Sequence, residues 1–370
     1  MNRRGKRCAA AVLAAALLLG GSTALAAGGD VLVPLSYLTE EFLPSLLDQA
    51  EDRITSDTQK TYQDALTSLQ KEYQSDLASA GGVSGLSDAR YKRGDVITLT
   101  TGSGVMLLSG EAQISGGTAV DVTGGYTLPI GAALPVRHHM LASESGSLSV
   151  KVTSETAVLS REGVASVTVS QETDYNALAK ALEDMGLFRG TGTAYGSGYD
   201  LENIPTRIEG LVMFLRLIGE EDAALAYTGA SPFTDVPAWA TQYVAYAYSK
   251  GYTTGVSATA FAPSRTMGSG EYVTFLLRVL GYSETGDKPD FTWDTALSRA
   301  KELGVLTSGE YTLLTGDTTF RRAHMAYLSY FVLDARRKTG ETLLTWMGQQ
   351  GAVDTAVIQT IRAGVTVTRK

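Results

Sequence analysis

Apolar positions follow different spacings in different parts of the chain. Within residues 34–80, Tyr62, Leu66 and Leu69 recur three or four positions apart, which predicts an amphipathic helix that is a spacer or packs on a partner helix. Residues 91–169 instead alternate short β-branched runs with Gly and Ser, as in DVITLTTGSG and TAVDVTGG, and this predicts a small antiparallel sandwich or barrel. Helical spacing then returns, so we expect an α+β protein of several domains.

The second helical part, residues 174–337, is built from repeats. They cover residues 174–219, 233–281 and 291–334, and each reads as a helix, a loop and a second helix. In each repeat the first helix is predicted to end at a Gly that an apolar residue follows, namely Gly186, Gly251 and Gly304. Repeats of this size bury a shared core by packing on each other. The tail, residues 338–370, is predicted to add one or two short helices.

The second helix of the first repeat begins with a specific local signal. Thr206 and Glu209 fit the capping box, in which each side chain bonds the backbone N–H of the other residue. An apolar stripe follows at helical spacing, and Gly219 is predicted to end the helix. In the second repeat, Glu271 and Gly281 lie as far apart as Glu209 and Gly219, so the two helices match residue for residue.

The first residues predict export. Basic residues precede the apolar run CAAAVLAAALLLGG, and a small-x-small site, ALA, follows at residues 24–26. We therefore expect residues 1–26 to be a signal peptide. Cys8 is the one cysteine in the sequence and precedes the alanine- and leucine-rich part of this run instead of following it, so we expect neither a lipid anchor nor disulfides in the mature chain.

Charge narrows the range of partners. The chain has 31 basic and 39 acidic residues, a formal net charge of −8, and removing a basic signal peptide makes it more acidic still. Such a chain is a poor match for nucleic acid, whose phosphates need basic surface, and for anionic lipid. No second long apolar run appears, so no membrane insertion is expected after signal cleavage.

Chemistry-bearing residues are sparse before the repeats. His138 and His139 are adjacent, and neighbours on a strand point to opposite faces, so we expect surface or turn histidines rather than a metal site. Residues 27–173 show no nucleophile motif and no metal motif, so we expect no catalysis and no cofactor. Paired carboxylates that meet only in space remain an alternative.

The second repeat resembles a known family. Its sequence FTDVPAWATQYVAYAYSKGYTTGVSATAFAPSRTM is similar to the S-layer homology (SLH) pattern: an F-x-D-V-P opening, a Trp-Ala helix start, a Gly after the first helix and F-x-P before the second. The family hallmark Thr-Arg-Ala-Glu is matched, with one substitution, by Thr206-Arg207-Ile208-Glu209. The resemblance covers less than half of the chain, and the layout resembles exported proteins of clostridia-like bacteria.

The resemblance implies a fold and a ligand. SLH triplets form an all-α pseudo-threefold bundle whose grooves bind secondary cell-wall polysaccharide, often through a pyruvylated terminal sugar. A guanidinium suits the ketal carboxylate, which implicates Arg207, with Thr206 and Glu209 beside it, and the matching Arg322. Ser269 replaces this arginine in the second repeat, and His324 replaces the glutamate in the third.

Asp235 and Trp239 match the family's opening motif. From the residues alone, Asp235 is interpreted as a helix N-cap. Trp239 is interpreted as a core residue packed with Tyr243 and Tyr246, and stacking on a sugar is the alternative.

We therefore expect a secreted, non-catalytic protein on the surface of a Gram-positive-type cell, held to the wall polysaccharide by its repeats. Other surface-layer proteins are further candidate partners. In one alternative the repeats keep the fold without the ligand, and the β domain binds a ligand or a protein. An envelope hydrolase is the less favoured alternative.

Overall fold

The computed structural model describes residues 61, 65, 68, 85–144, 146–192, 195–316 and 319–370. The described residues from Gly85 onward belong to one compact unit, Asp76–Lys370. The predicted signal peptide lies outside the described residues. So does the predicted helix over 34–80, apart from Thr61, Ala65 and Ser68, which are helical and exposed.

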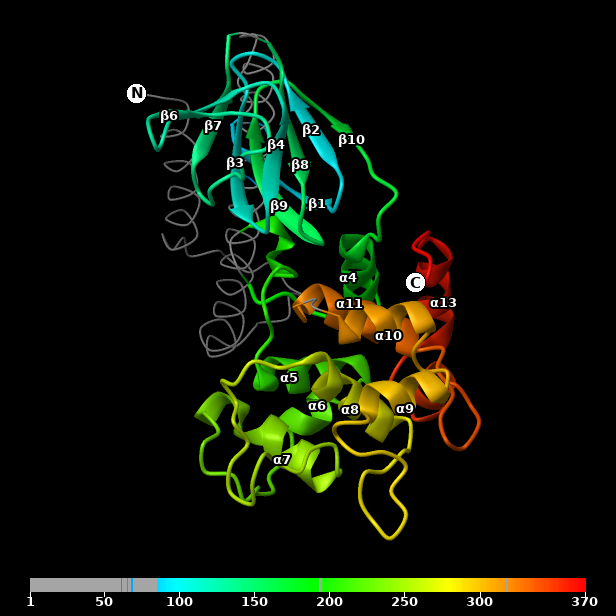
Figure 1. The fold of residues 1–370 in the computed structure, drawn as a ribbon. Coiled ribbons are helices and arrows are strands. Elements are labelled where there is room, and N and C mark those ends of the chain that lie inside the picture. Colours follow the sequence, from blue (N-terminus) through cyan, green and yellow to red (C-terminus); the bar gives the residue numbers. More distant parts are fainter. Residues whose placement is uncertain are drawn as a thin grey trace, which may run out of the picture. The chain divides into compact units, whose positions relative to one another are not determined.

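Two antiparallel sheets form a β-sandwich (Figure 1). The strands are β1 (Ser87–Lys92), β2 (Val96–Leu99), β3 (Gly104–Ser109), β4 (Ala112–Gly116), β5 (Ala119–Asp121), β6 (Tyr126–Leu128), β7 (His139–Ala142), β8 (Leu148–Val152), β9 (Thr156–Glu162) and β10 (Ala165–Thr168). The sheet orders are β1-β9-β3-β7-β5-β6 and β10-β2-β8-β4. The antiparallel β prediction is thus confirmed, and of its two forms the structure has the sandwich.

The sandwich core follows from alternation along its strands. In β8, Leu148, Val150 and Val152 are buried, whereas Ser149 and Lys151 between them are more exposed. One face of the strand therefore packs inward, as period-two patterning requires. Residues of both sheets meet in one apolar cluster, among them Ile97, Leu99, Val105, Leu107, Ile114 and Met140.

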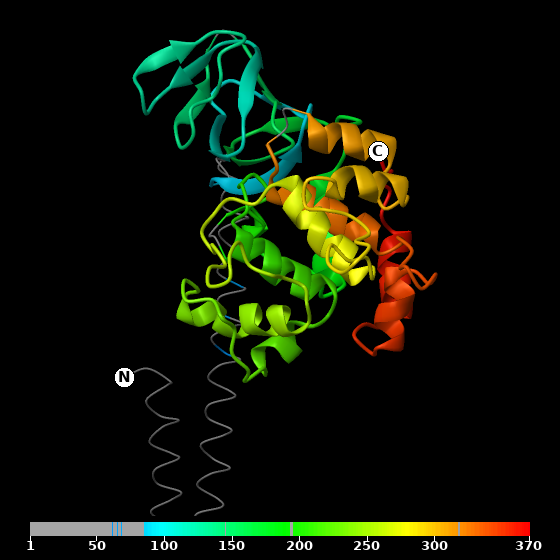
Figure 2. The same ribbon diagram turned by 60° about the horizontal axis from the view of Figure 1, so that its bottom comes forward.

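The rest of the described chain is helical (Figures 1 and 2). The helices are α4 (Tyr175–Asp184), α5 (Arg207–Leu217), α6 (Glu221–Leu225), α7 (Thr241–Ser249), α8 (Ser269–Val279), α9 (Ala296–Glu302), α10 (Ser308–Thr315), α11 (Arg322–Val332), α12 (Leu343–Gln349) and α13 (Thr355–Ala363), with the short 3-10 turns η2 (Gly196–Gly198) and η3 (Ala238–Ala240). The tail contributes α12 and α13. The mixed α+β class is confirmed.

The three repeats interlock in a closed order. The second helix of the first repeat, α5, packs against α7, the first helix of the second repeat. In the same way α8 packs against α9, and α11 packs against α4, which returns the order to the first repeat. A single apolar core runs through all three, and Phe214, Tyr272 and Tyr327 are among its largest members.

The local signals at the helix ends are present in the structure. Thr206 caps α5, and the Thr206 and Glu209 side chains form the expected capping box. Gly219 and Gly281 follow the second helices of the first two repeats with φ of 72° and 90°, a conformation that glycine adopts without strain. Among the described residues, no helix is long and apolar enough to cross a membrane.

Candidate functional site

The first turns of α5 and α11 are bonded to the loop of the following repeat. Their opening amides donate to loop carbonyls in the same pattern: Arg207 N to Arg265 O (2.8 Å), Ile208 N to Pro263 O (3.2 Å), Arg322 N to Asn203 O (2.9 Å) and Ala323 N to Leu201 O (3.0 Å). The arginine at each of these helix starts therefore lies against the loop of the following repeat.

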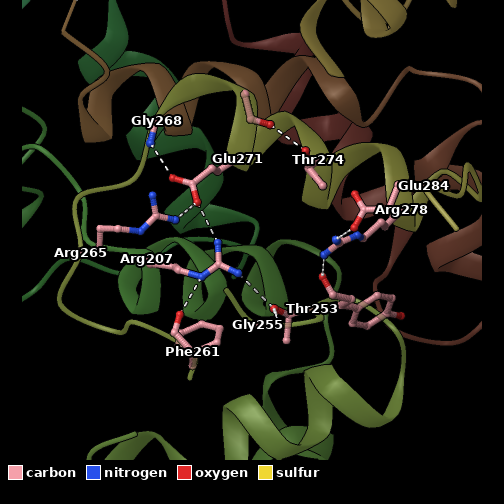
Figure 3. Close-up of polar contacts among 12 residues, drawn as sticks. Arg207, Thr253, Gly255, Phe261, Arg265, Gly268, Glu271, Thr274, Arg278 and Glu284 are labelled. Carbon is pink, nitrogen blue, oxygen red and sulfur yellow. Dashed lines mark hydrogen bonds and ion pairs between the residues drawn. The ribbon is translucent and has the colours of Figure 1, made fainter. Parts of the chain in front are cut away.

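This exchange creates two equivalent grooves. The Arg207 groove is a cavity of about 680 Å³, and its lining includes Arg207, Arg265, Glu271, Arg278, Glu284 and Trp293. Figure 3 shows the polar contacts among its charged residues. The Arg322 groove is a cavity of about 280 Å³, and its lining includes Arg322, Arg189, Thr191, Glu209, Arg216 and Trp239. All three repeats contribute to each groove: one supplies the helix wall, the next a tryptophan, and the remaining one the arginine.

Corresponding positions in the two grooves carry the same residue types. Glu209 and Arg216 of α5 match Glu271 and Arg278 of α8. The tryptophans lie just before the first helix of a repeat, and both are exposed, Trp239 to 60% and Trp293 to 79%. Each ring therefore presents apolar surface to solvent. The interpretation of Trp239 as a core residue is therefore wrong, although its ring does contact Tyr243, with the ring centroids 6.4 Å apart.

The positive charge of Arg207 is balanced by a carboxylate of the protein itself. It is 7% exposed, and its Nη1 lies 2.8 Å from Glu271 Oε1. Its Nε donates to Phe261 O at 3.0 Å, and its Nη2 donates to Thr253 Oγ1 at 3.4 Å (Figure 3). Burial lowers the pKa of Arg207, and attraction to Glu271 opposes this. The guanidinium does not project into solvent as a free cation.

Glu271 is shared between two arginines. Besides Arg207, it pairs with Arg265, whose side chain is half exposed. The third arginine of this groove, Arg278, pairs with Glu284 (Figure 3). Every arginine of the Arg207 groove thus has an acidic partner inside the protein.

Arg322 has a different environment. It is 5% exposed, and its Nε donates to Tyr199 O at 3.2 Å. Within the part of the chain that the structure describes, no carboxylate lies within ion-pair distance of its guanidinium. Burial lowers the pKa of Arg322, and the more distant carboxylates of Glu209 and Asp200 oppose this. A buried charge without a paired counterion is costly, so this guanidinium is suited to an anion.

The neighbouring cations of the Arg322 groove are already paired. Arg216 Nε lies 2.8 Å from Glu221 Oε1, and Arg189 Nη1 lies 3.7 Å from Glu221 Oε2. Tyr243 also donates to Glu221 at 2.9 Å. Among the described residues lining this groove, Arg322 is therefore the arginine left for an external anion.

Asp235 has a structural role that the sequence did not indicate. Its two carboxylate oxygens accept from Phe261 N at 2.8 Å and from Ala262 N at 2.7 Å. Ala262 has a φ of 59°, which a non-glycine residue rarely adopts. These hydrogen bonds lower the pKa of Asp235 and hold the loop whose Phe261 carbonyl binds Arg207. The interpretation as a helix N-cap is wrong.

The third equivalent position carries a buried histidine. His324 replaces the glutamate there and is buried, in ring contact with Tyr175 and Phe320. Its Nε2 lies 4.0 Å from Glu155 Oε1, on the sandwich. Ser269, which stands in place of the arginine, donates to Leu314 O at 3.1 Å. The two residues that depart from the family pattern, Ser269 and His324, are thus both engaged in contacts within the protein.

The burial of His324 affects the stability of the protein in acid. Burial lowers the pKa of His324 to about 4, from an ordinary value near 6.5, while Glu155 opposes the shift. Stability linked to this group is fully present above pH 6.5 and is lost as the pH falls toward 4, because the unfolded chain binds the proton first. We expect a loss of roughly 2–3 kcal/mol between pH 7 and pH 4.5.

A His324→Gln variant isolates this contribution. Glutamine can keep the capping contact that His324 Nδ1 accepts from Arg321 N, at 3.0 Å, and does not titrate. Urea unfolding at pH 7 and pH 4.5 should give a smaller loss for the variant than for the wild type. An equal loss in both proteins contradicts the assignment.

The two histidines of the sandwich bind separate carboxylates. His138 Nδ1 lies 2.7 Å from Asp121 Oδ2, and His139 Nε2 lies 2.7 Å from Glu162 Oε1. His139 is the first residue of β7 and His138 immediately precedes the strand, and their side chains contact different carboxylates. In the described ranges, no group of three or more His, Cys, Asp or Glu side chains is placed to hold a metal ion.

Comparison with known proteins does not identify a family for this chain. A scan against models of protein families finds no match to this chain, and a search of curated proteins finds none either. The two grooves, and the difference in charge pairing between them, are therefore the basis for a function.

Proposed function

We propose that this chain is an exported, non-catalytic cell-surface protein, and that its helical repeats anchor it to acidic secondary cell-wall polysaccharide of a Gram-positive-type wall. The observation that carries the proposal is the Arg322 groove, where a buried guanidinium that has no ion pair among the described residues lies in a cavity beside an exposed tryptophan. A ligand carboxylate would complete the charge and the bidentate hydrogen bonding of this arginine.

The size and lining of the groove favour a terminal sugar. Its volume of about 280 Å³ is at the low end of small-molecule sites. The Trp239 ring offers an apolar surface for the C–H face of a pyranose, while Arg322 lies within reach of an acidic substituent. A pyruvate ketal on the terminal residue of a wall glycan combines these two features.

The Arg207 groove is proposed to have a different task. It is larger, at about 680 Å³, and its arginines are paired with Glu271 and Glu284. An anion entering it would have to displace an existing ion pair. We therefore assign the charged end of the glycan to the Arg322 groove, and uncharged sugars at most to the Arg207 groove, where Trp293 is exposed.

The fold supports the same family interpretation. Second helices that pack on the first helix of the next repeat, in an order that returns to the first, suit a pseudo-threefold SLH bundle. The buried His324 at the third equivalent position suits a triplet in which two of the three grooves bind ligand. We propose this arrangement for residues 174–337, with the signal peptide directing export.

The two exposed tryptophans give a matched test of the assignment. Calorimetric titration of the full chain should detect wall polysaccharide with its ketal intact. It should detect much weaker binding after mild acid removes the ketal. Trp239→Ala should lower the affinity roughly tenfold, which corresponds to about 1.4 kcal/mol. Trp293→Ala changes a tryptophan that is also exposed but lines the other groove, and this variant should bind the charged terminus nearly as well as the wild type.

Two outcomes would count against the proposal. If affinity is indifferent to the ketal, the arginine does not bind its carboxylate. If the two tryptophan variants lose affinity equally, the Arg322 groove is not distinguished from the Arg207 groove. A wild-type chain that binds no wall glycan would direct attention to the β-sandwich as the functional part.

A further inference from the structure

The segment of residues 196–203, here called the junction segment, lies between the sandwich and the Arg322 groove. On the sandwich side it contacts Arg90 of β1. Arg90 Nη1 donates to Gly196 O at 2.8 Å, and Arg90 Nη2 pairs with Glu202. The Arg90 guanidinium also lies 5.6 Å from the centre of the Tyr199 ring. Both partners of the ion pair are buried, with side chains 8% and 4% exposed.

On the groove side the same segment holds the start of α11. Tyr199 O accepts from Arg322 Nε at 3.2 Å, and Asn203 O accepts from Arg322 N at 2.9 Å. Glu202 O accepts from the Arg321 guanidinium. Tyr199 and Glu202 therefore contact an arginine of the sandwich on one side and an arginine of α11 on the other.

The wall of the groove also rests on this segment. Thr191, which lines the Arg322 groove, donates from its N–H to Gly198 O at 2.8 Å. Gly196 is in close contact with the sandwich, because a Cβ at this position would lie 2.6 Å from Val158 Cγ2. Its φ of 57° also suits glycine. The junction segment thus fits closely against the sandwich, and it also holds two residues that line the groove, Thr191 and Arg322.

We propose that Arg90 is a positioning residue for the Arg322 groove, so that the sandwich is part of the glycan-binding unit. This rests on the proposed function of the groove. Arg90 acts through the junction segment, which places the Arg322 guanidinium and the Thr191 wall. An arginine suits the role, because its planar fork bonds Gly196 O, Glu202 and Asn176 Oδ1, the last at 2.8 Å, at the same time.

Coupling of this kind is reciprocal. If sandwich contact orders the groove, then ligand in the groove must strengthen sandwich contact by the same factor. Glycan binding is therefore expected to slow amide hydrogen exchange in residues 196–203 and also in β1, which does not line the groove. In an Arg90→Met chain, the protection of β1 by ligand should disappear.

The test uses the full chain with a matched pair of variants. Arg90→Met removes the fork and keeps an apolar stem. Arg93→Met is the control, because Arg93 is a nearby arginine whose ion pair, to Glu155 at 2.7 Å, does not involve the junction segment. Arg90→Met should lower affinity for ketal-bearing glycan about tenfold, and Arg93→Met should change it less than twofold. In an Arg322→Met background, Arg90→Met should have no further effect on affinity.

A readout without ligand separates this inference from the proposed function. The Arg322 Nε–H, bonded to Tyr199 O, can be followed by nuclear magnetic resonance of arginine side chains. Its solvent exchange should accelerate at least tenfold in Arg90→Met, whereas the Arg207 Nε–H should be unaffected. Glu202→Gln, a milder change at the same ion pair, should act in the same direction if Arg90→Met folds poorly.

The outcomes are distinct. Unchanged Arg322 Nε–H exchange in both variants overturns the positioning role, whether or not the protein binds glycan. Faster exchange together with a wild-type chain that binds no glycan confirms the positioning and refutes the proposed function. Faster exchange with the expected loss of affinity supports both.

Discussion

Replacing Arg322 with methionine is expected to weaken glycan binding strongly without destabilising the protein. Methionine keeps an apolar stem in a site where the guanidinium has no ion pair among the described residues and donates one hydrogen bond, to Tyr199 O. Removing an uncompensated buried charge is commonly neutral or stabilising, and here it relieves the desolvation that lowers the pKa of Arg322. Urea unfolding should give an unfolding free energy equal to or up to about 1 kcal/mol above that of the wild type.

The loss of affinity in the same variant should be large. Truncating one member of a buried, hydrogen-bonded charge pair costs roughly 2–5 kcal/mol in binding, which is about 30-fold or more. Calorimetry with ketal-bearing polysaccharide measures it. A variant that binds normally would refute the role of Arg322. A variant that unfolds readily would show that the arginine is a structural residue, as Arg207 is.

Replacing Arg207 with methionine is expected to have the opposite pattern, a large loss of stability. The change removes the buried partner of Glu271 and leaves the Phe261 carbonyl without its donor. Hydrogen bonds to charged groups contribute about 1.5–3 kcal/mol each, and Glu271 retains Arg265, so we expect a loss of roughly 2–4 kcal/mol. Denaturant unfolding at neutral pH measures this loss.

The control for this prediction lies on the same carboxylate. Arg265 also pairs with Glu271, but its side chain is 49% exposed. An exposed ion pair contributes less than about 1 kcal/mol, so Arg265→Met should change stability little. Equal stability changes in Arg207→Met and Arg265→Met would contradict the structural role assigned to the buried arginine.

Arg207 and Arg322 occupy equivalent positions but are expected to have different roles, one in stability and the other in binding. Both lie at the first turn of a second helix, both are nearly buried, and both donate from Nε to a loop carbonyl. They differ because Glu271 lies within reach of Arg207, whereas the corresponding Glu209 attracts Arg322 only at longer range. Binding sites commonly retain such locally unfavourable charge, at some expense of stability.

Features that depend on neighbours in sequence could be predicted. The capping box of Thr206 and Glu209 and the helix stop at Gly219 involve residues within one or two turns of a helix, so the sequence pattern determines them. The alternation that defines the β strands is equally local. These signals are sufficient to indicate a mixed α+β chain with repeated helix pairs.

Features that depend on distant contacts could not be predicted in the same way. Arg207 and Glu271 are 64 residues apart, and Arg90 and Glu202 are 112 apart, so no periodicity connects them. Trp239 was placed in the core because its spacing from Tyr243 fits a helix face, yet it precedes α7 and lies at a groove rim. The family resemblance indicated both arginines and could not indicate which one has no ion pair within the described part of the chain.

The equivalent role of Trp293 was also missed. The third repeat opens with FTWDT, and the offset of its tryptophan from the Phe differs from that in FTDVPAW of the second repeat. Only the fold shows that both tryptophans precede the first helix of a repeat and line a groove. A search for exposed aromatic residues just before each first helix would have found this position.

Co-sedimentation of the full chain with Gram-positive wall sacculi tests the central claim most directly. The sacculi are used before and after acid stripping of the secondary polysaccharide, with Arg322→Met alongside. We predict that the wild type pellets with intact sacculi, remains in the supernatant with stripped sacculi, and that Arg322→Met remains in the supernatant in both cases. A wild type that stays in the supernatant with intact sacculi, or pellets equally with stripped ones, would contradict anchoring to this glycan.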